Sequence, residues 1–315
     1  LGFDFITSLY VGVILSITST VIVVKILEQK GMAKSEELPL LVTILIIEDI
    51  FGVFALTFFS RLNTKVDLAP INLFASLLIS LTIMAIAYVV LKRILKPLIS
   101  WLVKYSTEDT ITFMSLGLCG GMSYLAFLFN LSPSVGAFLA GNIVASMPNS
   151  RVFEKAIHPF ILAFTSLFFF SIGTIVNFSI ILSSISIILV LFLINTISKF
   201  LAIGFGSYLF TNFNGKQAVF CGLAMLSVGE FSLLIAKEAN AVGLGTDLVS
   251  ITSAIILLSS ISMSILINYT EKIYNLTKSM LPIRLKEDMN LTSKYLNSIS
   301  LGMIKDKVST RRMFL

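Results

Sequence analysis

Charged residues are scarce in this chain of 315 residues, because only 13% of them are Asp, Glu, Lys or Arg. A soluble domain usually carries about 25% of such residues, so the scarcity argues against a soluble protein. Hydrophobic residues make up 56% of the chain, and the mean hydropathy is +0.96. The apolar runs are long and continuous, whereas a membrane β-barrel shows short alternating segments. The composition therefore predicts an all-α protein that crosses a membrane several times.

Histidine and cysteine are also rare: the chain has one histidine, His158, and two cysteines, Cys119 and Cys221. A single histidine excludes a His-rich metal site, and no second intramembrane aspartate is placed to form a catalytic pair. We therefore expect a protein that is not an enzyme and has no cofactor. The basic residues lie mainly in loops and near the C-terminus, as membrane topology requires, so we expect a lipid bilayer and no nucleic acid as partner.

Nine apolar segments are long enough, or nearly long enough, to cross a bilayer. They cover about residues 5–27, 39–60, 71–91, 109–129, 132–147, 156–176, 185–210, 216–236 and 246–269. Eighteen Lys and Arg residues of the loops and the C-terminal tail fall on one side of the membrane and three on the other. Because positive residues stay inside, we expect a multi-pass cell-membrane domain at 1–270 and a polar cytoplasmic tail at 271–315.

An acidic pair in the middle of an apolar run is the most informative feature of the sequence. Glu48 and Asp49 adjoin within the run 38–60. At about 1.5 Å per helical residue, Asp49 lies roughly 16 Å from the start of the run, close to the membrane midplane. An acidic residue there raises the free energy of insertion by about 2.5–3.5 kcal/mol. The pair therefore predicts a site for an ion or a proton.

Two further ionisable residues, Lys199 and Glu230, lie well inside apolar segments. Lys199 lies roughly 21 Å into its segment, a depth similar to that of the acidic pair, so a contact with Glu48 or Asp49 is geometrically feasible. Such a contact either holds two helices together or takes part in ion binding. One lysine cannot neutralise two carboxylates, so one acid remains to bind a proton or a cation.

Two segments contain residues that weaken a helix at mid-span. Four hydroxyl residues occur within Ser16–Thr20, and Ser227, Gly229 and Glu230 stand close together in the segment 216–236. Ser and Thr compete with the helix for backbone hydrogen bonds, although they often simply bond back to their own helix, and Gly weakens a helix. Together with the acidic pair, these breaks predict discontinuous helices with a transport site between them. A full segment follows each broken one, in opposite orientations, which predicts inverted repeats.

Six short motifs follow one another in the sequence: Ser19–Ile22, Glu48–Ile50, Gly136–Gly141, Phe169–Gly173, Lys199–Leu201 and Ser227–Phe231. In this order they resemble the monovalent cation:proton antiporters of the Kef-type branch of the sodium/proton exchanger superfamily. The resemblance covers about residues 1–270. It implies a homodimer in which a mobile core with two crossing, unwound helices exchanges Na⁺ or K⁺ for H⁺ by alternating access.

The resemblance also implies roles for individual residues. Asp49 matches the aspartate that binds the cation and the proton, with Glu48 as a second carboxylate beside it. Lys199 matches a basic residue that pairs with an acid in the core. The residues matching the unwound stretches are Thr18, Ser19, Thr20, Ser227, Gly229 and Glu230. Members of the family have helices before the position of Leu1, so we expect this chain to be a fragment that lacks them.

Two questions stay open at the level of the sequence. A channel-like K⁺ efflux pathway would also suit lining hydroxyls and an acid at the midplane, and currents uncoupled from protons would distinguish it. Carboxylate, hydroxyl and carbonyl oxygens suit hard cations in general. The size of the coordination site depends on the backbone geometry of the broken helices, so the sequence does not choose between Na⁺ and K⁺.

Overall fold

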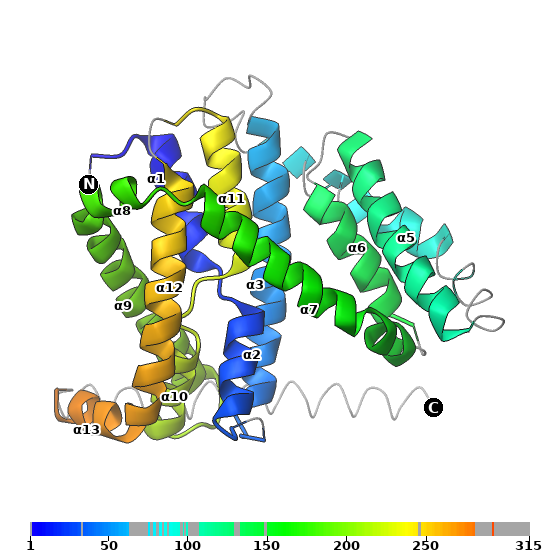
Figure 1. Cartoon of the computed structure of the whole chain (residues 1–315). Helices are drawn as coiled ribbons and strands as arrows, with labels where there is room; N and C mark the ends of the chain where they lie inside the picture. Colours follow the sequence, from blue (N-terminus) through cyan, green and yellow to red (C-terminus); the bar gives the residue numbers. More distant parts are fainter. Residues whose placement is uncertain are drawn as a thin grey trace. The chain divides into compact units, whose positions relative to one another are not determined.

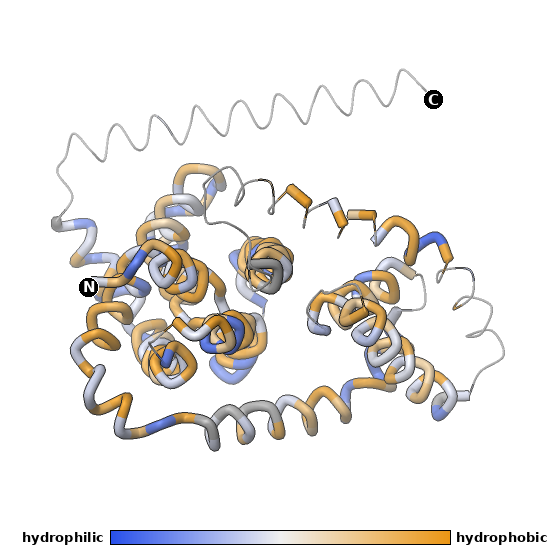
Figure 2. Tube along the Cα trace, turned by 90° about the horizontal axis from the view of Figure 1, so that it is seen from above, coloured by the Kyte–Doolittle hydropathy of each residue, from blue (hydrophilic) through white to orange (hydrophobic). Residues whose placement is uncertain are grey.

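The computed structural model describes residues 2–32, 34–62, 107–128, 133–147, 150–244 and 247–280, together with scattered positions from 75 to 99 and residue 292. The regular elements in these ranges are helices. Four helices are long and apolar enough to cross a membrane: Leu38–Phe59, Asp109–Leu128, Ile185–Phe210 and Leu248–Ser279. Hydrophobic colours dominate the helices in Figure 2. The prediction of an all-helical membrane protein with several apolar spans is confirmed.

Most of the long helices coincide with the predicted segments. Helix α9 (Ile185–Phe210) begins and ends at the predicted residues. Helix α7 (Ser150–Ile175) begins before the predicted residue 156, and Pro159 lies inside the helix. The remaining helices in this group differ from the prediction by a few residues: α3 (Leu38–Leu62), α5 (Glu108–Leu128), α6 (Pro133–Ala145) and α12 (Leu248–Leu266). The predicted segment 71–91 lies mostly outside the described residues.

The two segments with helix-weakening residues each contain two helices. In the first, α1 (Phe5–Ser16) and α2 (Thr20–Gln29) are separated by three non-helical residues. In the second, α10 (Gly215–Ala224) ends before α11 (Glu230–Ala241) begins. We call these non-helical stretches, residues 17–19 and 225–229, the first and the second interruption. The second interruption begins slightly before the predicted position. Hydroxyl side chains lower the local preference for helix at both places, and Gly229 does so at the second.

The chain divides into two compact units, which are described separately. The first comprises Leu1–Ile14, Asp49–Leu182 and Phe231–Ser253. Its helices α5 and α6 run side by side in Figure 1, and α7 begins next to them. A Cβ atom at Gly136 of α6 would lie 2.2 Å from the carbonyl oxygen of Met122 on α5. Only glycine allows this approach, and small residues are the usual means of close helix packing in membranes.

The second unit comprises Leu15–Glu48, Ser183–Glu230 and Ala254–Leu315. Its core is formed by side chains from several helices and from the second interruption, among them Val23, Leu27, Leu41, Leu45, Cys221, Met225, Leu226, Met263 and Ile267. Apolar side chains therefore surround the end of α10, where the helix gives way to the interruption. This unit contains both interruptions.

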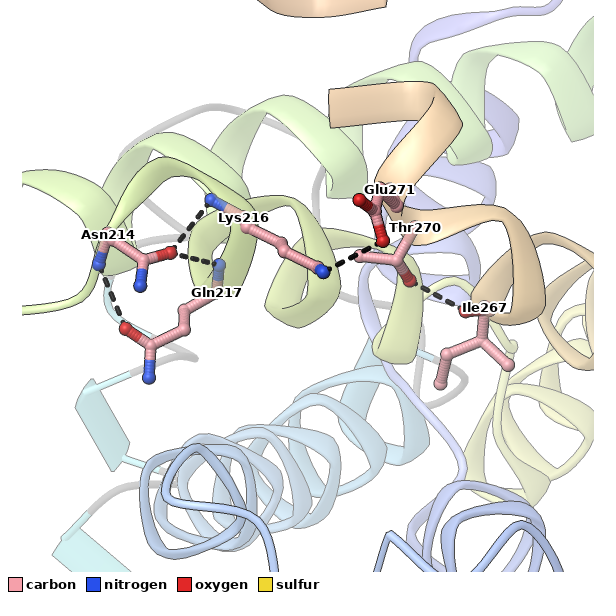
Figure 3. A network of polar contacts seen from close by, with 6 residues as sticks. All are labelled: Asn214, Lys216, Gln217, Ile267, Thr270 and Glu271. Atoms are coloured by element: carbon pink, nitrogen blue, oxygen red, sulfur yellow. Dashed lines mark hydrogen bonds and ion pairs between the residues drawn. The ribbon is translucent and has the colours of Figure 1, made fainter. Parts of the chain in front are cut away.

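Hydrogen bonds and one ion pair stabilise the beginning of α10 (Figure 3). Asn214 caps the helix, because its Oδ1 accepts from the backbone N–H groups of Lys216 and Gln217, both at 3.0 Å. Gln217 completes the capping box by accepting from the backbone N–H of Asn214 at 3.0 Å. Lys216 Nζ then reaches Glu271 Oε2 at 3.0 Å, on α13 (Thr270–Met280). This ion pair connects the start of α10 to the helix that follows α12.

Asp247 caps the beginning of α12 in the first unit. Its Oδ2 accepts from Ser250 Oγ at 2.6 Å, and its Oδ1 accepts from Asn240 Nδ2 at 2.9 Å. Partial burial disfavours the ionised carboxyl, but the hydrogen bonds from Ser250 and Asn240 outweigh it, so the pKa of Asp247 lies below its ordinary value of 3.8. A lowered pKa in the folded state stabilises the fold above the unfolded pKa. This stabilisation is lost as the pH falls toward the folded pKa.

The substitution Asp247→Ala should therefore lower the free energy of unfolding by about 1 kcal/mol at neutral pH, the usual value of a helix cap. The difference from the unmodified protein should shrink as the pH is lowered below about 4, where the carboxylate of the unfolded chain becomes protonated. Thermal unfolding of the purified protein in detergent at a series of pH values measures this. A difference that stays constant down to about pH 3 would show that the charge of Asp247 has no such role.

Candidate functional site

The two interruptions meet backbone to backbone within the second unit. Thr18, between α1 and α2, forms an isolated antiparallel bridge with Val228, between α10 and α11. The backbone N–H of Gly229 donates to the carbonyl of Ile17 at 3.0 Å. Ile17 and Val228 are fully buried, and Thr18 is 1% exposed. Two non-helical stretches that lie far apart in the sequence therefore pair inside the protein.

Gly229 permits this close approach. A Cβ atom at this position would lie 2.8 Å from the carbonyl oxygen of Thr18, 2.9 Å from its carbonyl carbon and 3.1 Å from the backbone nitrogen of Ser19. These are all backbone atoms, which cannot move away from a new methyl group as the end of a flexible side chain can. A side chain at residue 229 would therefore push the two stretches apart.

Lys199 reaches the paired stretches from α9. Its Nζ donates to the hydroxyl of Thr18 at 2.9 Å and to the carbonyl of Ser227 at 3.1 Å. The residue is only 7% exposed, in the middle of an apolar helix. A buried amine is unfavourable unless it is hydrogen-bonded, and these two oxygens meet that need. Lys199 thus contacts both interruptions at once.

Glu48, on α3, contacts the same threonine. Its Oε2 accepts from the backbone N–H of Thr18 at 2.9 Å. Thr18 therefore connects Glu48 with Lys199, through its backbone on one side and its hydroxyl on the other. Asp49 is the next residue of α3 and is half-buried. Consecutive residues of a helix lie about 100° apart around its axis, so Asp49 presents a second carboxyl group on a neighbouring face of α3.

Ser19 and Glu230 join the starts of α2 and α11. Ser19 has an extended conformation, with φ −80° and ψ 110°, and its Oγ accepts from the backbone N–H of Ile22 at 3.2 Å. The same hydroxyl donates to Glu230 Oε2 at 2.9 Å. Glu230 is the first residue of α11, where the helix dipole favours a negative charge. Thr20 follows Ser19 as the first residue of α2.

Two contacts at the second interruption were not predicted from the sequence. The side-chain Nδ2 of Asn195 donates to the carbonyl of Leu226 at 2.9 Å, and Ser259 Oγ accepts from the backbone N–H of Val228 at 3.0 Å. Without water, such backbone groups need partners inside the protein. Asn195 precedes Lys199 by one helical turn in the same apolar segment. A polar residue one helical turn before a buried lysine is the sequence signal that could have revealed the role of Asn195.

The arrangement gathers carboxylate, hydroxyl and carbonyl oxygens in an apolar surrounding. Oxygen ligands of this kind suit hard cations, and a carboxylate can hold either a proton or a cation. Among the residues that the structure describes, no three His, Cys, Asp or Glu side chains are grouped so that they could hold a metal ion. Within the second unit, Lys199 and Glu48 are joined through Thr18.

Replacing Lys199 by Met keeps an unbranched side chain that is one atom shorter and removes its hydrogen-bond donors. The buried carbonyl of Ser227 would lose a donor in a dry interior, at a cost of about 1–3 kcal/mol, whereas the hydroxyl of Thr18 would keep its bond to the carbonyl of Met225. We expect a clear fall in the Tm of the purified protein in detergent, measured by the unfolding of its helices.

The matched control is Lys216→Met. Lys216 also forms a 3.0 Å contact, with Glu271, but the two side chains are 53% and 72% exposed. An exposed ion pair contributes only about 0–1 kcal/mol, so the Tm should change little. Equal losses of stability in the two variants would contradict the role assigned to Lys199 at the interruptions.

Comparison with known proteins identifies the family. The profile described as "Sodium/hydrogen exchanger, transmembrane" matches residues 1–269. The Na⁺/H⁺ antiporter of Enterococcus hirae is 29% identical over 85% of this chain and 70% of its own length. The Na⁺/H⁺-K⁺ antiporter GerN of Bacillus cereus is 27% identical, and the K⁺/H⁺ antiporter subunit KhtU of Bacillus subtilis is 24% identical. These two matches cover 84% and 87% of this chain, respectively, and 67% of each relative. Since the family profile covers most of the sequence, this chain belongs to the sodium/hydrogen exchanger family of cation/proton antiporters and is a transporter, not an enzyme.

Proposed function

We propose that this antiporter exchanges Na⁺ or K⁺ for H⁺ at Asp49 by alternating access. Asp49 binds the cation when it is ionised and releases it when a proton binds, so the two ligands compete for one carboxylate. Glu48 and Lys199 set the local field, and the groups titrate as a coupled unit. The observation that carries the proposal is the Glu48–Thr18–Lys199 network, because it gathers charged groups at the paired interruptions, with Asp49 adjacent to Glu48 on α3.

The proposal includes two discontinuous helices that cross at the bridge between Thr18 and Val228. Helices α1 and α2 form one of them, and α10 and α11 form the other. The close backbone contact at Gly229 supports this arrangement. Half-helix ends and unwound carbonyls near the membrane midplane are typical of transport sites. The long helices α3 and α12 follow the two interrupted ones in the sequence, which supports an inverted repeat.

The substrate class follows from the relatives and from the oxygen-rich site. The names of the relatives include both Na⁺/H⁺ and K⁺/H⁺ antiporters, which supports an alkali cation as the exchanged ion. We place the chain in the Kef-type branch and expect it to act as a homodimer with a cytoplasmic C-terminus. The excess of Lys and Arg on the inner side supports this orientation.

The test is transport by the full-length protein reconstituted in lipid vesicles. A pH gradient is imposed and followed with a pH-sensitive dye, and Na⁺ or K⁺ is then added. The cation should dissipate the gradient in a saturable manner, and its apparent KM should rise as the pH falls, because protons compete for Asp49. Cation currents that move without protons would overturn the proposal in favour of a channel.

A further inference from the structure

We propose that Asn195 is a positioning residue for cation binding, which acts through the second interruption. This inference rests on the proposed function. Asn195 lies in the apolar helix α9 and is fully buried. Its Nδ2 donates to the carbonyl of Leu226 at 2.9 Å. An amide in such a place would be unfavourable without this bond, so the bond fixes both the side chain and the carbonyl.

Asn195 and Lys199 act as a pair. They are one turn apart on α9 and therefore lie on the same face of the helix. Asn195 holds the carbonyl of Leu226 at 2.9 Å, and Lys199 holds the carbonyl of the next residue, Ser227, at 3.1 Å. In a regular strand, neighbouring carbonyls point to opposite sides. Two neighbouring carbonyls that face one helix therefore require an irregular backbone, and the two donors of α9 stabilise it.

The chemistry of the amide is specific to this position. The carbonyl of Leu226 can only accept, so Asn195 must present its NH₂ group, and neither an ionised Asp nor Leu could do so. In the part of the chain that the structure describes, Asn195 Oδ1 and Ser227 Oγ are buried and have no hydrogen-bond partner. These two oxygens retain the capacity to accept from a water molecule or to coordinate a cation. Asn195 thus combines the donor that fixes the carbonyl of Leu226 with a buried oxygen that has no hydrogen-bond partner among the described residues.

The effect of Asn195 on transport follows from these contacts. By holding Leu226, it keeps the carbonyl of Ser227 in place for Lys199, and Lys199 in turn contacts Thr18. Thr18 donates to Glu48, which adjoins Asp49. If the backbone at Leu226 and Ser227 were no longer fixed, the amine of Lys199 would change its position relative to the carboxylates of α3. The main result should be weaker cation binding, with less effect on the maximal rate of correctly folded molecules.

The experiment measures cation-dependent proton flux by the full-length protein in vesicles, normalised to the amount of folded protein. Asn195→Leu keeps the number and branching of the side-chain heavy atoms and removes the donor. We expect its apparent KM for the cation to rise about tenfold, with a maximal rate within about twofold of the unmodified protein. Asn195→Gln keeps the amide and should restore much of the affinity. The control is Thr196→Val, since Thr196 Oγ1 has no hydrogen-bond partner in the described residues and the substitution preserves shape.

A purely structural role would lower the amount of folded protein and leave the KM unchanged, and this result would overturn the inference. If Asn195→Leu does not fold, Asn195→Ser is measured instead. Its shorter side chain cannot reach Leu226, so an unchanged KM in this variant would also overturn the inference. An absence of exchange in the unmodified protein would refute the proposed function, and this inference with it. Exchange in the unmodified protein with an unchanged KM in the variants refutes only the role of Asn195.

Discussion

Asparagine in place of Asp49 is expected to reduce cation-coupled proton flux by about 100-fold or more, equivalent to about 2.7 kcal/mol of activation free energy. Asparagine has nearly the same shape as aspartate, but it carries no negative charge and releases no proton. Glu48 remains in place on α3, where it accepts from Thr18. The variant should therefore fold and lose exchange. The measurement is the dissipation of an imposed pH gradient in vesicles after addition of Na⁺ or K⁺.

The control for this experiment is Asp4→Asn. Asp4 precedes α1 and is exposed, and its Oδ1 accepts from the backbone N–H of Thr7 at 3.3 Å. Asparagine offers the same capping oxygen, so flux should stay close to that of the unmodified protein. Cation-dependent proton flux that survives Asp49→Asn would show that the exchanging carboxylate is elsewhere, and the proposed function of Asp49 would be wrong.

The substitution Gly229→Ala is expected to have the second-largest effect. Its new methyl group would meet the backbone of Thr18 and Ser19 at 2.8–3.1 Å. Separating the two stretches would strain the hydrogen bond from Gly229 to Ile17, which is 3.0 Å long. Overpacking of this kind destabilises a protein by about 1–3 kcal/mol. Because the same backbone atoms hold the polar network, we also expect transport to be lost in the molecules that do fold.

A matched glycine on α9 provides the comparison. A Cβ atom at Gly206 would meet no atom within 4 Å. Alanine there should be neutral or slightly stabilising, because alanine favours a helix by up to about 1 kcal/mol over glycine. Thermal unfolding and vesicle transport should be measured for both variants. A Gly229→Ala protein as stable and active as Gly206→Ala would refute the close crossing of the two interruptions.

Part of the candidate site could be predicted from local chemistry. Hydroxyl residues and glycine are poor helix formers, so the breaks near Thr18 and Gly229 were visible as patterns in the sequence. Lys199 stood out because a charge in an apolar segment is costly. Asn195 was missed, because an uncharged amide in an apolar segment is a weaker signal than a charge and gives no hint of its partner. The sequence predicted a contact between Lys199 and Glu48 or Asp49. In the structure, Thr18 lies between Lys199 and Glu48, because its hydroxyl accepts from Lys199 and its backbone N–H donates to Glu48. Depth within the membrane could not specify this geometry.

The helical class, the approximate limits of the long helices that the structure describes and the places where residues 17–19 and 225–229 depart from helix could all be predicted from the sequence. These features depend on the residues of one segment and on the exclusion of water from the bilayer core. The hydrogen-bond partners at these two stretches, in contrast, depend on tertiary packing. Lys199 bonds to Thr18, which is 181 residues away, and to Ser227, which is 28 residues away. Such pairings depend on how separate helices pack, and no local pattern of residues encodes them.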